Sequence, residues 1–278
     1  MKKLLFSFAL LFATQLFAQP INMPQPSPIQ TIKQNFGLGN IELSYSRPSV
    51  KNRSVFKENS ELAPIDQVWR TGANAATTIT FSDEVSINGV AIKAGKYGLL
   101  SIPSKKEFTI IISKDVNVNQ PSMYKQENDV VRFTAPIMKM KEKAETFTMQ
   151  FANVNFESIE LHIMWDNVAV SLPITTNVQD RVKADIAKNL AGDKPNYQAA
   201  ANFYYEMAKD YPQALSAVTK AIDANKNAFW LYLLKARIES SMGDKASAKA
   251  SAEKCIQIAT EAKNTDYVRS AKELISKL

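Results

Sequence analysis

The chain has 278 residues, of which 45% are hydrophobic and 22% charged, as in ordinary globular proteins. Its net charge of +7 is spread along the chain, with no run of more than two lysines or arginines. Nucleic-acid-binding proteins concentrate such charge in a patch or stripe, so we expect no nucleic-acid partner. The single cysteine, Cys255, excludes an internal disulfide, and its helical context predicts a small buried residue.

Residues 1–18 have the features of a signal peptide. Two lysines form a positive start, Leu4–Phe12 form an apolar core, and Ala18 precedes a cleavage point. A short membrane anchor is the alternative, but the apolar run is shorter than the ~18 residues that span a bilayer. No cysteine lies near the cleavage point for a lipid anchor, and no later segment is apolar enough to cross a membrane. We therefore predict a periplasmic or secreted protein whose mature chain starts near Gln19.

A proline-rich leader over 19–30 and a mostly β domain over 31–176 are predicted next. Proline fixes φ and lacks an N–H, so the four prolines keep the leader extended. Alternating apolar and polar residues then predict short strands at 41–46, 77–81, 85–87, 90–92, 97–102, 107–112, 147–151, 159–165 and 168–172. Two-residue turns are expected at Asn88-Gly89 and Asp166-Asn167. This pattern predicts an antiparallel β-sandwich or barrel-like domain.

One long polar stretch interrupts these strands. It runs from Lys114 to Asp129 and shows no period in its apolar residues. We predict a loop, and loops of this length inside a compact domain are usually functional or disordered.

Residues 177–278 are predicted to form an all-α array. The period of apolar residues changes here to about 3.6, which predicts helices near 179–190, 197–209, 212–224, 228–241, 245–260 and 265–277. A spacing of 34 residues pairs Asp210 with Asp244, Ala214 with Ala248, and Ala221 with Cys255. The tail therefore resembles about 2.5 tetratricopeptide repeats, in which small residues let the two helices of a hairpin pack closely. A generic helical bundle is the alternative. With the β domain, the fold class is α+β in two domains.

The sequence contains no recognisable catalytic constellation, and we predict neither a cofactor nor a metal site. The only histidine, His162, is expected on the polar face of its strand beside Glu160. A serine-histidine-aspartate triad would have to use it, and no nucleophile-elbow sequence is present. One histidine and one distant cysteine make a poor zinc site, and Gly37-Leu-Gly39 lacks the lysine and helix of a phosphate-binding loop. Chemistry based on carboxylates alone stays open.

The candidate ligand-binding residues are Arg47, Arg53, Trp69, Arg70 and Asn74. Arginine side chains bind carboxylates and phosphates through paired hydrogen bonds, and a tryptophan face offers a stacking surface. In the alternative, structural interpretation, the tryptophan fills an edge of the core and the arginines bond to backbone carbonyls or pair with acids. We favour the structural interpretation.

At these residues the chain resembles a known family. The segments that carry the resemblance are Tyr45–Ser49 (YSRPS), Val68–Asn74 (VWRTGAN), Ala94–Gly98 (AGKYG) and Phe108–Ile112 (FTIII). They resemble the bacterial family called domain of unknown function 2911, over about residues 27–174. The resemblance implies an exported protein of the kind common in Bacteroidota and supplies no catalytic residues. The chain departs from the family pattern at Asn52, where a glycine is common, and after Lys114-Asp115, where a Trp-Gly pair is missing.

The sequence favours a non-enzymatic exported envelope protein, in which a β binding or scaffold domain carries a helical tail for protein interaction. Repeat hairpins form surfaces that hold peptide segments or partner helices, so we predict a protein partner for the tail. One alternative is a module that binds an envelope glycan or an anion. Another is an enzyme that acts on carbohydrate or peptide through acidic residues near Arg70. Burial of Trp69 and its neighbours would favour the scaffold, and an open cleft with close carboxylates would favour the enzyme.

Overall fold

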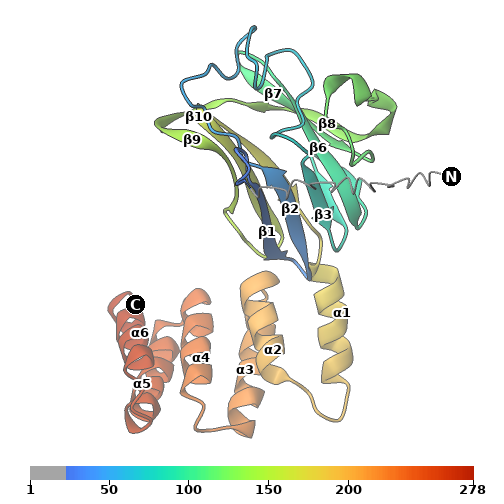
Figure 1. Ribbon diagram of the computed structural model, residues 1–278. Coiled ribbons are helices and arrows are strands. Elements are labelled where there is room, and N and C mark those ends of the chain that lie inside the picture. Colours follow the sequence, from blue (N-terminus) through green and yellow to red (C-terminus); the bar gives the residue numbers. More distant parts are fainter. Residues whose placement is uncertain (1–22) are drawn as a thin grey trace, which may run out of the picture.

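The structure is a computed structural model that describes residues 23–278. The expected signal peptide and the first residues of the leader lie outside the described residues. The fold class agrees with the prediction, because two antiparallel sheets are followed by helical hairpins (Figure 1). In Figure 1 the helices stand in a row beneath the sheets, with α1 below the β domain and α6 at the far end.

The larger sheet has six strands in the order β1-β2-β3-β6-β7-β8, and each neighbouring pair is antiparallel. The strands are β1 (Ile29–Phe36), β2 (Gly39–Ser46), β3 (Thr78–Phe81), β6 (Gly95–Pro103), β7 (Glu107–Ser113) and β8 (Asp129–Pro136). The two edge strands, β1 and β8, have no counterpart among the predicted strands. β1 begins inside the expected leader, and only Phe36 of its side chains is fully buried. An edge strand buries few side chains, which weakens the alternation that predicts it.

The smaller sheet has the order β5-β4-β10-β9. Its strands are β4 (Val85–Ile87), β5 (Val90–Ile92), β9 (Met138–Ala152) and β10 (Ser158–Thr175). β4 and β5 form the expected hairpin, with φ of 50° at Asn88 and 77° at Gly89. Both residue types tolerate the left-handed conformation that this two-residue turn requires.

β10 doubles back on itself. The Ser171 hydroxyl donates to a carboxylate oxygen of Glu160 at 2.7 Å, although the residues are 11 positions apart. A straight strand of that length would separate them by roughly 36 Å. Asp166, with φ of 51°, marks the reversal at the predicted turn. β10 therefore consists of a first limb, 158–165, and a second limb, 168–175.

The core of the β domain lies between the two sheets. Leu43, Ile79 and Leu99 of the larger sheet face Leu161 and Leu172 of the smaller one, and all five are fully buried. Each such side chain contributes about 1.5–3 kcal/mol when removed from water. The sheets are held together by this layer of alternating apolar residues.

The helices lie within two residues of the predicted ranges. They are α1 (Gln179–Leu190), α2 (Tyr197–Asn202), the π-helical turn η3 (Phe203–Met207), α3 (Tyr211–Ala224), α4 (Phe229–Ser241), α5 (Lys245–Glu261) and α6 (Thr265–Ser276). The π turn continues α2 directly, so together they match the second predicted helix.

Repeated positions in the array have repeated roles. Asp210 and Asp244, 34 residues apart, precede α3 and α5, and each accepts a hydrogen bond from the amide three residues later. Such caps satisfy amides that have no partner within the helix. Ala214 and Ala248 are both 0% exposed, as expected for small residues between closely packed helices.

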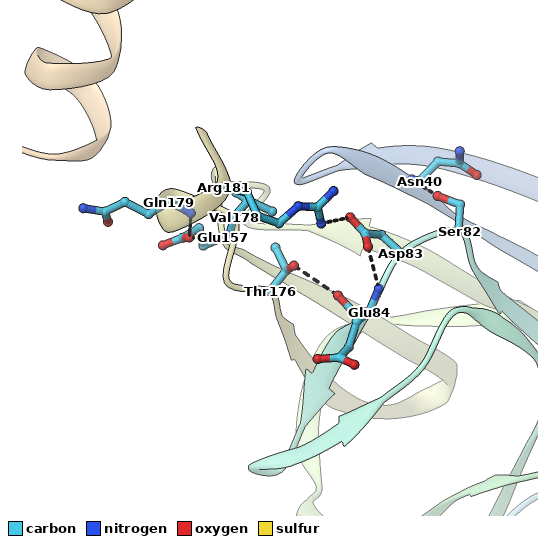
Figure 2. Close-up of polar contacts among 9 residues, drawn as sticks. All are labelled: Asn40, Ser82, Asp83, Glu84, Glu157, Thr176, Val178, Gln179 and Arg181. Carbon is cyan, nitrogen blue, oxygen red and sulfur yellow. Dashed lines mark hydrogen bonds and ion pairs between the residues drawn. The ribbon is translucent and has the colours of Figure 1, made fainter. Parts of the chain in front are cut away.

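The junction between the sheets and the array is held by polar contacts (Figure 2). The Arg181 guanidinium lies 2.5 Å from a carboxylate oxygen of Asp83, and its hydrogen bond lowers the pKa of Asp83. The Thr176 hydroxyl donates to the carbonyl of Glu84 at 3.2 Å. The carboxylate of Glu157 accepts the amides at the start of α1. These contacts tie α1 to turns at the end of both sheets.

Candidate functional site

Trp69, the centre of the predicted binding cluster, lies in the core of the β domain. It is 5% exposed, and its ring stacks on that of Trp165 with centroids 5.8 Å apart. The ring also meets Phe56 and Phe147 edge to face. Its indole nitrogen donates to the carbonyl of Gly72 at 3.0 Å, so the one polar atom of the side chain is satisfied. This environment is that of a packed aromatic core, and the ring is withdrawn from ligands.

Arg47 and Arg53 hold the segment that follows β2. Arg47 donates to the carbonyl of Phe147 at 3.1 Å and to the hydroxyl of Thr148 at 2.8 Å, which fastens the segment to β9. Arg53 donates to the carbonyls of Val50 (3.1 Å) and of Ser49 (2.8 Å). Both guanidinium groups therefore use part of their donor capacity on protein acceptors.

Arg70 and Asn74 reach two further segments. Arg70 donates to the carbonyl of Asn119 in the long loop, and burial lowers the pKa of its guanidinium. Asn74 donates to the carbonyl of Ser27 in the leader at 3.1 Å. Among residues 23–278 no carboxylate forms an ion pair with Arg70. The structure thus sends the predicted residues to different partners and does not gather them around one opening.

The long loop from Lys114 to Asp129 covers the outer face of the larger sheet. Val118 is buried there against Leu100 and Ile111, whose side chains point away from the main core. The rest of the loop contains two short 3-10 helices, Pro121–Met123 and Gln126–Asn128. The predicted loop is therefore packed over its middle part, where an apolar anchor fixes it.

His162 lies on the outer face of the smaller sheet, as predicted, with its Nε2 atom 2.9 Å from the carboxylate of Glu160. The same carboxylate accepts hydrogen bonds from Ser171 (2.7 Å) and Asn153 (2.8 Å). Hydrogen bonds from His162, Ser171 and Asn153 lower the pKa of Glu160 to about 2. In a serine hydrolase the histidine must stand between the serine and the acid. Here the acid stands between the other two, so this geometry does not activate Ser171.

The helical array carries a groove lined by aromatic and basic side chains. A hollow of about 330 Å³ lies between the start of α2, the end of α3 and the start of α4, and includes Lys194 and Trp230. A second hollow of about 160 Å³, between α1, α2 and α3, includes Lys220. Tyr197 lines both hollows, so we treat them as one feature, the array groove.

The side chains of the array groove are positioned by neighbouring helices. Trp230 is 36% exposed, and its indole nitrogen donates to the side-chain oxygen of Gln198 at 3.1 Å. The ammonium of Lys220 lies 5.3 Å from the centroid of the Tyr197 ring, within the range of a cation–π contact. The only charged residues that line the groove are lysines. Partly exposed aromatic rings with a basic rim suit an acidic peptide segment with an apolar side chain.

These groove residues were not among the predicted site residues. Tyr197 and Trp230 both lie in the first turn of the first helix of their hairpin, but the 34-residue spacing pairs Tyr197 with Leu231 and does not align the two rings. Lys220 approaches Tyr197 from a different helix, and that contact has no signal in the sequence.

Within residues 23–278 no helix is both long and apolar enough to cross a membrane. Nor does the described part of the chain hold a group of three or more His, Cys, Asp or Glu side chains arranged to bind a metal ion.

A protein-family model matches the β part of the chain. Residues 27–174 match the family described as "Protein of unknown function (DUF2911)", and this segment coincides with the two sheets. No curated protein matches the chain. The match covers more than half of the chain and ends before the helical array. The chain therefore belongs to the DUF2911 family.

Proposed function

We propose that the protein is a non-enzymatic exported scaffold whose helical array binds an acidic segment of a partner protein. The observation that carries the proposal is the array groove, where Tyr197 and Trp230 offer apolar area and Lys194 and Lys220 offer positive charge. From Asp180 to Leu278 the array holds 16 lysines and arginines against 12 aspartates and glutamates. The resulting net charge of +4 also suits an acidic partner.

Export supports an envelope role, because the signal peptide expected over residues 1–18 would deliver the chain to the periplasm or beyond. The β domain serves as the scaffold. Its tryptophan and arginines bind its own segments together, which favours a rigid support over a catalytic pocket. The 34-residue spacing supports a tetratricopeptide-like array, a class of repeat that holds peptide segments.

The test places a photo-reactive benzoylphenylalanine at position 230 of the full mature chain, in envelope extract. We expect a cross-linked partner whose contacting peptide is acidic, and we expect Lys220→Glu to reduce its yield because the charge complementarity is reversed. Raising the salt concentration should also reduce the yield, since exposed charges are screened within ~3 Å at 1 M.

The matched controls are Lys272→Glu, which makes the same charge change on α6 outside the groove, and the photo-reactive residue placed at position 272. Equal yields from positions 230 and 272, or a basic contacting peptide, would contradict the proposed function.

A further inference from the structure

A second groove lies on the β domain. It has a volume of about 530 Å³ and runs between β8, the second limb of β10 and the turn that joins β4 to β5. Ligand pockets in proteins usually measure ~300–1,000 Å³. We call it the β8–β10 groove. The predicted binding residues do not line it, so it is separate from the cluster considered above.

The lining of the β8–β10 groove is amphipathic and carries no charge. Its apolar part includes Phe133, Pro136 and Pro173, and its polar part consists of hydroxyl groups and the amide of Asn88. No lysine, arginine, aspartate or glutamate lines it, although 22% of the chain is charged. An anionic or cationic ligand would enter without a counter-charge, which is unfavourable. The ligand that fits is neutral.

The polar groups of the groove are divided into donors and acceptors. The Ser171 hydroxyl donates its proton to Glu160, so its oxygen offers only acceptor lone pairs to a ligand. The Thr175 hydroxyl likewise donates to the carbonyl of Ser86 at 3.4 Å. Asn88 is exposed, and its side-chain amide supplies two donors and an acceptor. A ligand with several hydroxyl groups can donate hydrogen bonds to Ser171 and Thr175 and accept one from Asn88.

An added peptide strand fits this groove poorly. Pro136 lies on the β8 wall and Pro173 on the β10 wall. Proline has no N–H, so each wall lacks a donor that a pairing strand would use. β8 is an edge strand of the larger sheet, and an edge proline such as Pro136 protects a sheet from strand addition.

We propose that the β8–β10 groove binds a neutral saccharide. A pyranose ring presents C–H groups on its faces, which suit Phe133 and the prolines, and hydroxyl groups on its rim, which suit Asn88, Ser171 and Thr175. The proposal concerns the β domain and is independent of the array groove.

The test is calorimetric titration of the full mature chain with three neutral saccharides: chitotetraose, cellotetraose and maltotetraose. Tetragalacturonate serves as the anionic comparison, and an uncharged peptide of alternating threonine and valine serves as the strand comparison. We expect binding of at least one neutral saccharide, insensitive to salt because no charge takes part.

Two variants locate the binding. Asn88→Gly keeps the positive φ of the turn and removes the amide, so we expect about 2- to 12-fold weaker binding, the worth of one hydrogen bond. Asn52→Gly is its matched control, because Asn52 is also exposed with φ of 61° and lies away from the groove. Thr134→Trp should fill the groove and abolish binding. Thr31→Trp, at an exposed threonine on the opposite edge strand, should leave binding intact.

Three results would overturn the proposal. The first is that none of the three neutral saccharides binds. The second is that binding survives both Asn88→Gly and Thr134→Trp. The third is that the peptide binds more tightly than every saccharide, which would make the groove a strand-addition site.

Discussion

The two regions of the molecule are stabilised in different ways. The β domain joins residues that are distant in sequence: the amide of Met149 donates to the Tyr45 hydroxyl at 2.9 Å across 104 positions. The array joins neighbouring helices through small side chains such as Ala214 and Ala248. When contacts join segments that are distant in sequence, the loss of one large side chain weakens the whole domain. When contacts are mainly between neighbouring helices, a substitution weakens mainly the helices that it touches. The β domain should therefore be the more cooperative region, and the array the more tolerant one.

The largest expected effect tests the aromatic core. Trp69→Ala removes a ring that contacts three other aromatic rings, and should destabilise the β domain by about 3–5 kcal/mol. Urea unfolding followed by near- and far-ultraviolet circular dichroism should show the sheets unfolding while helical signal persists. Trp230→Ala, at a partly exposed site in the array, is the control and should cost less than about 1 kcal/mol. Simultaneous loss of both signals in Trp69→Ala would show that the regions are one cooperative unit.

The second change disturbs the array alone. Ala248→Leu places three extra carbons between helices at a position that is 0% exposed, and should cost about 1–3 kcal/mol through overpacking. Urea unfolding followed by the same two circular-dichroism signals should show the helices unfolding at a lower urea concentration and the sheets at an unchanged one. Ala246→Leu, at an exposed position of the same helix, should have little effect. A shift of the sheet transition would contradict the independence of the regions.

The third change concerns the arginines. Arg70→Ala releases the carbonyl of Asn119 and loosens the long loop, with an expected cost of about 1 kcal/mol because the side chain is only half-buried. Proteolysis of the loop should become faster. Arg53→Ala is the comparison, since Arg53 is exposed and bonds only within its own turn. If Arg70→Ala left both stability and proteolysis unchanged, the structural interpretation would be wrong.

The smallest effect is a pH dependence. The folded-state pKa of Glu160 is about 2, below its ordinary value of 4.5, so ionised Glu160 stabilises the fold above pH 4.5. That contribution should be lost as the pH falls from 4.5 towards 2. Glu160→Gln should therefore show a shallower fall in the free energy of unfolding across this window. If the free energy of unfolding fell equally with pH in the variant and the unaltered protein, the hydrogen bonds of ionised Glu160 would not contribute to stability.

The array was the more predictable region from sequence. Its signals are local: the 3.6-residue period and an aspartate cap at each second helix place the ends within two residues. The central strands were predictable because a strand with a neighbour on each side buries one of its faces, which gives a strong alternation of apolar and polar residues. β1 and β8 escaped prediction because edge strands bury few residues. The doubling of β10 was indicated by Asp166-Asn167, where the chain takes up a positive φ.

The sites were much less predictable. Proximity in sequence suggested that Arg70 and Asn74 act together, but Thr71 and Asn74 have φ of 53° and 56° and turn the chain sharply. The two side chains consequently reach different segments. The array groove and the β8–β10 groove are each lined from three or more elements, and no single segment of sequence shows their outline. The shape of such a groove depends on how distant elements pack, and the period of apolar residues within one segment does not reveal it.

The cap of α1 has a consequence for the order of assembly. Val178, the residue before α1, has no side-chain acceptor, and Glu157 in the turn between β9 and β10 receives the amides of Val178 and Gln179 at 2.8 and 2.9 Å. A carboxylate there also complements the positive end of the helix dipole. The acceptor exists in place only after that turn has closed, and the β domain leaves the ribosome before the helices do. The first helix therefore gains its cap only once the sheets have folded, whereas α3 and α5 carry their own caps in Asp210 and Asp244.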